Sequence, residues 1–342
     1  MECPHRVRQD APEVSVVIPT RDRARFLPDA IATSLGQEGV DLEVIVVDDG
    51  SRDETPELLA RVGDERLRVI RFDPERGQSK ARIAGVDAAR GRWLAFLDDD
   101  DLWSPSKLRL HLDAAARSGA TWAYCGVLLV SPEGDVVRVS GPPRPEDVLR
   151  EVLRANVVQA GASTVIVQAD QYHAVGGFQD GLHNPWDLWI RLAADGPAAA
   201  VDEPLVAYRR HPGSFISGNR QVAMSEARHI AEKYRSLSAA HGVAFDLDAY
   251  GRWLDSERLR GMRSLAMVRF AEGRRPAAFR LQLRVLVATR KLQDLRRLVR
   301  IVAGNAAKDV FRLLAPASEA LRSAEPIPDW LSVQLDRSRD GQ

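Results

Sequence analysis

Short apolar runs alternate with helical patterns over the first hundred residues of the chain. Runs of six to eight residues, rich in Val, Ile and Leu, predict strands at 14–19, 42–49, 67–72 and 92–98. Stretches between them, such as 24–35 and 79–90, carry apolar residues at helical spacing. Continuously apolar strands that alternate with helices are typical of a parallel sheet covered on both faces. We therefore expect an α/β fold with a Rossmann-like, mostly parallel sheet flanked by helices.

The pattern changes twice after residue 120. Residues 120–130 and 135–140 predict a hairpin, 163–168 and 204–210 predict two more strands, and 186–194 predict a helix. From about residue 220 onward the pattern is helical throughout. The domains that we expect are an N-terminal tail at 1–12, an α/β domain at 13–218, a helical C-terminal region at 219–325 and a tail at 326–342.

Composition narrows the class of protein. The 342 residues include 48 basic and 48 acidic residues, a balance that gives no reason to expect a nucleic-acid partner. The two cysteines, Cys3 and Cys125, predict neither a disulfide framework nor a zinc site and fit a reducing compartment. The sequence shows neither a secretory signal nor an apolar run long enough to span a membrane. We therefore expect a cytoplasmic protein.

Polar clusters follow three of the predicted strands. They are Pro19–Asp22, Asp48–Ser51 and Asp98–Asp101. In open α/β sheets ligands bind beyond the carboxyl ends of the strands, so we expect these clusters to meet at one cleft.

The stretch "WLAFLDDDDLW", residues 93–103, runs an apolar strand into four aspartates. Hard cations such as Mg²⁺ or Mn²⁺ prefer oxygen ligands, and a cation would offset the repulsion between the carboxylates. The alternative is a solvated acidic loop in which one aspartate caps the helix that starts near Pro105. A calcium loop of the EF-hand type is excluded, because counting from Asp98 the sixth and twelfth positions hold Trp103 and Arg109.

Asp48 and Asp49 end the second predicted strand, where an acid is well placed to accept hydrogen bonds from a ribose or base. Ser51 and Glu54 have the spacing of a helical capping box, which predicts a structural role for Ser51. The first strand is followed by "PTRDRARF" and not by a G-x-G-x-x-G fingerprint, so a nicotinamide enzyme is excluded.

Six elements occur in a characteristic order. "VSVVIPTRDR", "EVIVVDDGSRDET", "ERGQSKARIAG", "WLAFLDDDDLW", "GGF" and "WDLWIRLA" resemble the signature of the inverting glycosyltransferases of family 2, over roughly residues 13–215. The resemblance implies a GT-A fold, a nucleotide-diphosphate sugar as donor and Mg²⁺ or Mn²⁺ on the diphosphate. The acceptor would be a hydroxyl of a glycan, a lipid-linked molecule or a natural product.

The resemblance also implies roles for individual residues. Asp100, the last acid of the D-x-D spacing, would be the main metal ligand. His211 would add a metal or phosphate contact, unless it is a loop histidine packed against Tyr208. The donor-binding set would be Pro19, Thr20, Arg21, Asp48, Asp49, Arg82, Asp98 and Asp99.

The general base is where the sequence departs from the family pattern. Many relatives carry Glu-Asp directly before the Trp-Asp-Leu-Trp helix, whereas this chain has Asn184 and Pro185, which cannot accept a proton at neutral pH. We predict Asp187, one turn into the helix, as the base. Its alternative is an ion pair with Arg191, four residues away. Asp180 and His183 are the next candidates.

Two other classes of protein remain open. The missing Glu-Asp pair fits a binding module that has the fold of a nucleotide-sugar enzyme but has lost its base. A nucleotidyltransferase is the other alternative, although that class usually shows a Gly-rich basic loop after the first strand.

Residues 269–312 are dense in arginine and carry apolar residues at helical spacing. A basic amphipathic helix can lie on an anionic membrane surface, which predicts a peripheral membrane contact through this segment, at the inner membrane face. The alternative is a helical bundle on the α/β domain with a solvated basic face.

Overall fold

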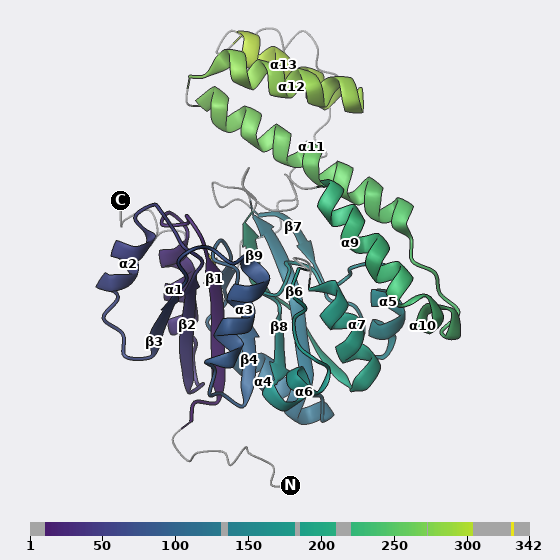
Figure 1. The fold of residues 1–342 in the computed structure, drawn as a ribbon. Helices are drawn as coiled ribbons and strands as arrows, with labels where there is room; N and C mark the ends of the chain where they lie inside the picture. The colour runs from purple at the N-terminus through teal and green to yellow at the C-terminus, as the bar shows by residue number, and fades with distance from the viewer. Residues whose placement is uncertain are drawn as a thin grey trace.

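The computed structural model describes residues 11–130, 136–181, 185–209, 220–271, 273–303 and 330–331. Over these residues the chain forms an α/β domain followed by helices (Figure 1). Nine strands of the described part form one sheet in the order β3-β2-β1-β4-β8-β6-β9-β5, with β7 paired to β6.

The strands are β1 (Val14–Thr20), β2 (Leu42–Asp48), β3 (Leu67–Arg71), β4 (Trp93–Phe96), β5 (Leu102–Trp103), β6 (Trp122–Val130), β7 (Val136–Ser140), β8 (Val165–Gln168) and β9 (Ala198–Arg209). The helices of the α/β domain are α1 (Leu27–Leu35), α2 (Thr55–Arg61), α3 (Gln78–Asp87), α4 (Lys107–Ser118), a 3₁₀ turn η1 (Pro145–Asp147), α5 (Val148–Arg154), α6 (Ala169–Ala174) and α7 (Trp186–Asp195). The helices after this domain are α9 (Arg220–Lys233), α10 (Arg235–Ala240), α11 (Leu247–Ala271), α12 (Arg275–Thr289) and α13 (Leu292–Ala303).

The first four strands run parallel, as the alternation of strands and helices in the sequence predicts. β1 pairs in parallel with both β2 and β4, and β2 pairs in parallel with β3. β8 is antiparallel to β4 and β6, and β9 is parallel to β6. The carboxyl ends of β1, β2 and β4 therefore meet at one edge, which we call the carboxyl edge.

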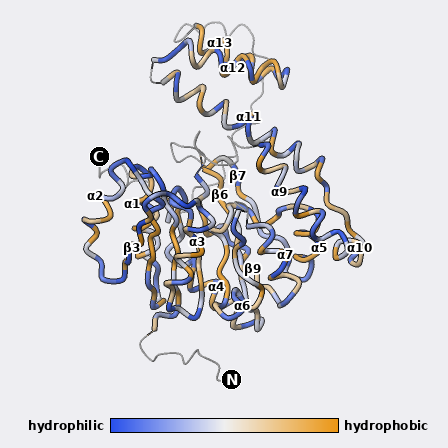
Figure 2. The backbone as a smooth tube through the Cα atoms, in the orientation of Figure 1, coloured by the Kyte–Doolittle hydropathy of each residue, from blue (hydrophilic) through white to orange (hydrophobic). Residues whose placement is uncertain are grey.

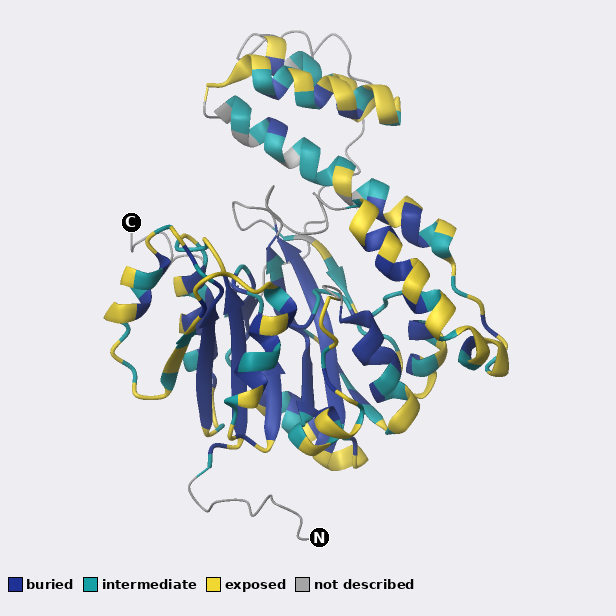
Figure 3. Cartoon of the chain, in the orientation of Figure 1, coloured by how far each residue is buried: buried dark blue, intermediate teal, exposed yellow. Residues whose placement is uncertain are grey.

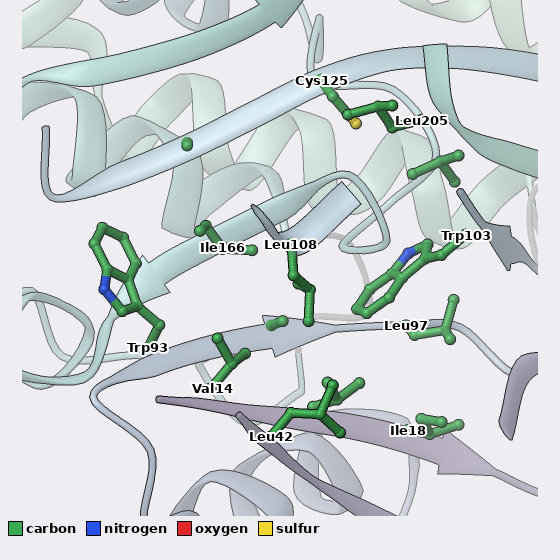
Figure 4. Close-up of a cluster of buried hydrophobic side chains, with 14 of the residues drawn as sticks. Val14, Ile18, Leu42, Trp93, Leu97, Trp103, Leu108, Cys125, Ile166 and Leu205 are labelled. Carbon is green, nitrogen blue, oxygen red and sulfur yellow. The ribbon is translucent and has the colours of Figure 1, made fainter. Parts of the chain in front are cut away.

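Apolar side chains fill both faces of the sheet. Figure 3 shows that most of the central strands are buried. On one face, residues from α1, α2 and α4 pack against the strands, and Figure 4 shows part of this core around Leu108 and Trp103. On the other face, residues from α3, α5, α7, α9 and α11 form the second core. The mostly parallel sheet flanked by helices is confirmed.

Helix α3 lies unusually close to the sheet. A Cβ atom at Gly85 would stand 2.3 Å from Cγ1 of Val17, so a side chain at this position would push α3 away from β1. The close approach matters because α3 carries Arg82 toward the carboxyl edge.

Three local predictions differ from the structure. β9 begins at Ala198, earlier than predicted, because a run of alanines carries little strand signal. The two-residue strand β5 follows the aspartates and has no periodicity to detect. The capping box of Ser51 and Glu54 is wrong: α2 begins at Thr55 without a side-chain cap, and the Ser51 hydroxyl accepts a hydrogen bond from the backbone N–H of Asp22 instead.

The helices α9–α13 extend from the α/β domain, and α11 carries α12 and α13 beyond the carboxyl edge (Figure 1). The Arg220 guanidinium forms an ion pair with Asp255, which joins α9 to α11. None of the helices in the described ranges has the length and apolar character needed to span a membrane.

Two residues near the C-terminus return to the sheet. Leu331 is fully buried in a small cluster with Leu102, Leu128 and Val130, and Trp330 packs against the same cluster. This contact falls inside the segment predicted as a tail, 326–342.

Candidate active site

The four aspartates of residues 98–101, called the aspartate run below, form a tight turn just beyond the end of β4. The backbone N–H of Asp101 donates to the carbonyl of Asp98 at 3.1 Å. Asp99 is 8% exposed and Asp101 is 0% exposed, while Asp98 and Asp100 are half-buried. The alternative of a solvated acidic loop is therefore wrong.

Asp101 anchors the turn to the rest of the sheet. The Ser163 hydroxyl donates to its Oδ2 at 2.6 Å, and the backbone N–H of Arg209 donates to its Oδ1 at 3.3 Å. The same Ser163 hydroxyl accepts from the backbone N–H of Asp98 at 3.0 Å. One serine at the start of β8 thus holds both ends of the aspartate run.

Asp98 is paired with Arg82 of α3. The guanidinium donates to Oδ1 at 2.6 Å, and the Arg82 side chain is almost completely buried. Arg82 also lies over the ring of Phe178, 5.6 Å from its centroid. The loop containing Phe178 therefore covers the Arg82–Asp98 pair from the side of α7.

Asp99 points back to β1. The Thr20 hydroxyl donates to its Oδ2 at 2.7 Å, and Nε of Arg23 lies 3.9 Å from its Oδ1. Thr20, Arg82, Asp98 and Asp99, which the sequence placed in one donor site, are thus brought together by β1, α3 and the aspartate run.

Three carboxyl groups of the aspartate run, those of Asp98, Asp99 and Asp101, have raised pKa values. Burial raises the pKa of Asp98 despite the nearby charge of Arg82, and it raises the pKa of Asp99 and Asp101 well above the ordinary range. The charge of Asp100 adds to each of these shifts. Four carboxylates with this little positive compensation fit a divalent cation, since hard cations take oxygen ligands.

The protein alone does not supply a complete metal site over the described residues, because no cluster of three or more His, Cys, Asp or Glu has a suitable arrangement there. His211, the predicted additional ligand, lies outside the described residues, as do His183 and Asn184.

Asp48 and Asp49 both use their carboxylates within the protein. Asp48 accepts from Arg71 at 2.7 Å and from the backbone N–H of Ser51 at 2.9 Å, and it is buried. Asp49 accepts from the backbone N–H groups of Arg76, at 2.6 Å, and Gly77, at 2.9 Å. The Asp49 contacts hold the loop that leads into α3, and the Asp48 contacts join β3 to the turn at Ser51.

The other predicted donor contacts lie close to the same edge. Pro19 is buried within β1. Arg21 is half-exposed and pairs with Glu75 at 3.0 Å, and Glu75 comes from the loop before α3. The structure thus brings Arg21 next to the loop that Asp49 holds.

Asp187, the predicted base, is buried in a cluster with Arg191, Lys233 and Tyr234, called the Asp187 cluster below. Lys233 donates to Oδ1 at 2.7 Å and the Tyr234 hydroxyl donates to the same atom at 2.9 Å, while Arg191 donates to Oδ2 at 2.9 Å. The predicted alternative, an ion pair with Arg191, is therefore present.

Burial by itself raises the pKa of Asp187, but the hydrogen bond from Lys233, the charge of Arg191 and the hydrogen bond from Tyr234 outweigh it, and the pKa lies below its ordinary value. A general base near neutral pH needs a raised pKa and access to the acceptor. The geometry of the Asp187 cluster therefore favours a structural role for Asp187.

Asp180 has a different environment. It lies in the loop before α7, it is exposed, and its Oδ2 stands 3.4 Å from Nζ of Lys80 in the first turn of α3. Lys80 lies two residues before Arg82, so Asp180 contacts the N-terminal part of the helix that carries Arg82.

Sequence reasoning did not identify Ser163, Arg23 and Phe178 as parts of the site. Ser163 was placed only as the first residue of a strand, and its partner Asp101 is 62 positions away in the sequence. Phe178 belongs to the "GGF" motif, which did signal this loop without assigning it a contact.

Residues 15–163 match the family model described as Glycosyl transferase family 2. The match begins in β1 and includes α3 and the aspartate run. Residues 15–163 form a domain of glycosyl transferase family 2. The resemblance is confirmed over this region, which contains the first four of the six motifs.

Named relatives of this family 2 domain belong to polysaccharide biosynthesis. The succinoglycan biosynthesis protein ExoO of Rhizobium meliloti (strain 1021) is 44% identical over 128 residues, which are 37% of each chain. TuaG of Bacillus subtilis (strain 168), named as a teichuronic acid biosynthesis glycosyltransferase, is 28% identical over 236 residues, 67% of this chain and 90% of TuaG. The match thus spans little more than a third of ExoO.

Solved structures share the fold. Residues 1–349 of TarS from S. aureus, in complex with UDP-GlcNAc, superpose with a TM-score of 0.53 at 14% identity, over 85% of this chain and 80% of that chain. At this identity the similarity establishes the fold alone, and it confirms the predicted GT-A type.

Proposed function

We propose that this protein is an inverting glycosyltransferase that moves a sugar from a nucleotide-diphosphate donor to an acceptor hydroxyl. The observation that carries the proposal is the buried aspartate run at the carboxyl edge, next to Arg82 and Thr20, inside a family 2 domain. Carboxylates with raised pKa values can hold a divalent cation, and such a cation stabilises the negative charge of a departing diphosphate.

Within this proposal, Asp98 and Asp100 would hold Mg²⁺ or Mn²⁺, which would offset the negative charge of the donor diphosphate. Thr20 and Arg82 would position the donor through the carboxylates that they contact. Asp49 would do so through the loop before α3, and Asp48 through the turn at Ser51. The partly exposed Arg21 lies at the same edge, where its guanidinium would contact the nucleotide. His211 remains a predicted further contact.

We propose Asp180 as the general base in place of Asp187. The base must reach the acceptor hydroxyl, and Asp180 is exposed beside the first turn of α3, whereas Asp187 is buried among cationic partners. Asp187 would then act as a positioning residue. Its partner Arg191 also donates to the carbonyls of Val175 and Gly177, which fixes the loop that presents Phe178 to Arg82.

The acceptor that we propose is a saccharide hydroxyl of a polysaccharide precursor, free or lipid-linked. ExoO and TuaG support this choice because both are named for the biosynthesis of bacterial polysaccharides.

A second candidate is a nucleotide-sugar-binding protein that has lost catalysis. Two observations favour it: Pro185 occupies a position where many relatives have an acid, and the carboxylate of Asp187 is fully engaged by its neighbours.

A donor panel tests the proposal. The protein is incubated with UDP-, GDP- and dTDP-sugars, including UDP-GlcNAc, with Mg²⁺, Mn²⁺ or chelator, and release of nucleoside diphosphate is measured. Metal-dependent release, with a transfer product of opposite anomeric configuration, supports the transferase. Binding of a donor without release supports the non-catalytic protein. Pyrophosphate release from a nucleoside triphosphate and a sugar phosphate would identify a nucleotidyltransferase.

A further inference from the structure

Helices α12 and α13 expose an unusual number of large apolar side chains. Val287 is 69% exposed, Leu292 63% and Val302 61%, and Leu283 and Leu295 are exposed as well. Leu283 and Val287 are four residues apart on α12, and Leu292, Leu295 and Val302 fall on one face of α13 at the helical repeat. Figure 2 shows the alternation of apolar and polar residues in both helices.

The opposite faces of α12 and α13 are held together by hydrogen bonds to the buried Asp294. Asp294 of α13 is fully buried and accepts two hydrogen bonds from Arg263 of α11, at 2.7 and 2.8 Å. Thr289 donates to it at 2.6 Å and Gln282 contacts its backbone carbonyl at 3.0 Å. Because Asp294 must face α11 and α12, the leucines on the other side of α13 must face outward.

Basic residues dominate the same segment. Residues 274–303 contain nine Arg and Lys residues and a single acid, Asp294. That acid is neutralised inside the helical unit by Arg263 and Arg297. The outer surface of α12 and α13 therefore combines exposed aliphatic side chains with positive charge.

A groove crosses this surface between the start of α12 and the end of α13. Its volume is about 340 Å³, and its lining is Arg275, Pro276, Phe279, Arg280, Ile301 and Val302. The guanidinium groups of Arg275 and Arg280 could bind the anionic headgroup of a lipid, and the apolar residues of the groove could contact its acyl chain.

We propose that the outer surface of α12 and α13 docks on an anionic lipid bilayer. The exposed leucines and valines enter the acyl boundary, and the surrounding arginines contact acidic headgroups. Figure 1 shows that α12 and α13 lie beyond the carboxyl edge, the edge that carries the aspartate run. Docking would therefore hold the candidate active site toward the membrane. The inference does not depend on the transfer reaction.

Charge and shape favour a bilayer over other occupants. Nucleic acid would attract the arginines but would gain little from exposed aliphatic side chains, because its contacts are mainly to phosphates. A second copy of this chain would place two basic surfaces against each other, and like charges oppose association.

Vesicle flotation of the full chain tests the proposal. One set of vesicles contains only neutral phosphatidylcholine, and the other also contains anionic phosphatidylglycerol. We expect binding to the anionic vesicles that weakens when salt rises from about 0.1 M to about 0.5 M. The double variant Leu292→Gln, Val302→Gln should lower the partition coefficient about tenfold or more, without any change of charge. Arg280→Gln and Arg284→Gln should each lower it about fivefold.

Matched variants control for unspecific effects. Val69→Gln with Val222→Gln changes two exposed valines on β3 and α9, and Arg117→Gln removes an exposed arginine of α4. Both controls should float as the unmodified protein does, and circular dichroism should show that every variant is folded.

Four outcomes would overturn the proposal. The first is the absence of vesicle binding, and the second is equal binding to neutral and anionic vesicles. The third is binding that survives the Leu292→Gln, Val302→Gln double change but is competed by RNA. The fourth is a protein that runs as a dimer on gel filtration, while the double variant runs as a monomer and still binds vesicles unchanged.

Discussion

The aspartate run and the Asp187 cluster are both buried acidic regions, and they differ in how their charge is compensated. In the aspartate run, burial and mutual repulsion raise the pKa values of three carboxyl groups even though Arg82 and Thr20 contact two of them. In the Asp187 cluster, two cations and a tyrosine hydroxyl surround one carboxylate, and its pKa is lowered.

This difference in charge compensation indicates a ligand site at the aspartate run and a structural ion pair at the Asp187 cluster. A buried charge that the protein compensates by itself has no need for an outside partner, and breaking its contacts costs stability. Carboxylates left with too little positive charge are destabilising until a cation arrives. The position of a buried acid in the sequence says less about its role than the charges that surround it.

Removing a carboxylate from the aspartate run should have the largest effect on turnover. We expect Asp100→Asn to lower kcat by about 10³-fold or more, because a metal ion contributes several kcal/mol to stabilising the diphosphate charge. The variant should unfold at the same or a higher temperature, since one of four repelling charges is gone. Metal titration of donor hydrolysis together with calorimetry checks both parts. Normal kcat in the presence of chelator would contradict the metal role.

Asp180→Asn should have the next largest effect. Loss of a general base costs about 10²–10⁴-fold in rate, and donor affinity should stay unchanged. The measurements are kcat for transfer and the Kd of the nucleoside diphosphate. Lys80→Gln, which removes only the partner of Asp180, is the matched control and should retain most of the activity. If Asp180→Asn is fully active, the base lies elsewhere.

Asp187→Asn should act mainly on stability. We expect it to lower the free energy of unfolding by about 1–3 kcal/mol, because Lys233 and Arg191 lose a charged partner in a largely buried place. The control Asp113→Asn removes an exposed i,i+4 pair with Arg109 and should cost at most about 0.5 kcal/mol. Urea unfolding gives both values. A kcat reduced about 10²-fold or more in a variant of normal stability would return Asp187 to the role of base.

The pH dependence of the same variant gives the smallest and most specific signal. The pKa of Asp187 is lower in the folded state than its ordinary value of 3.8. The carboxylate therefore adds stability above that value and loses it as pH falls through the folded pKa. The difference in unfolding free energy between the protein and Asp187→Asn should be constant above about pH 5 and shrink below about pH 4. A difference that grows in acid would mean a raised pKa and would contradict the structural role.

The sequence could predict those parts of the site where a short stretch departs from the ordinary composition of a strand. Four aspartates after an apolar run conflict with ordinary strand chemistry, and that conflict predicted a ligand site at the carboxyl edge. The parallel strands were predictable for a similar reason, since their apolar runs are continuous.

What sequence could not predict depends on contacts between distant segments. Lys233 and Tyr234 reach Asp187 from 46 and 47 positions away, and the i,i+4 partner Arg191 was the only one visible in the helix pattern. Asp48 meets Arg71 because the two residues are directly paired between β2 and β3, a register that the separate strands do not reveal.

Helix α11 sets how far α12 and α13 lie from the α/β domain and how they are rotated about the helix axis. Its 25 residues span about 37 Å at 1.5 Å per residue, and two ion pairs tie its middle part to other helices, Asp255 to Arg220 of α9 and Arg263 to Asp294 of α13. Each residue inserted between those ties would lift α12 and α13 by about 1.5 Å and turn them by about 100°. Two added residues would point the apolar surface away from its present direction, while seven would raise it by about 10 Å and nearly restore its direction. The length of α11 therefore sets both the distance of α12 and α13 from the carboxyl edge and the direction in which their apolar surface faces.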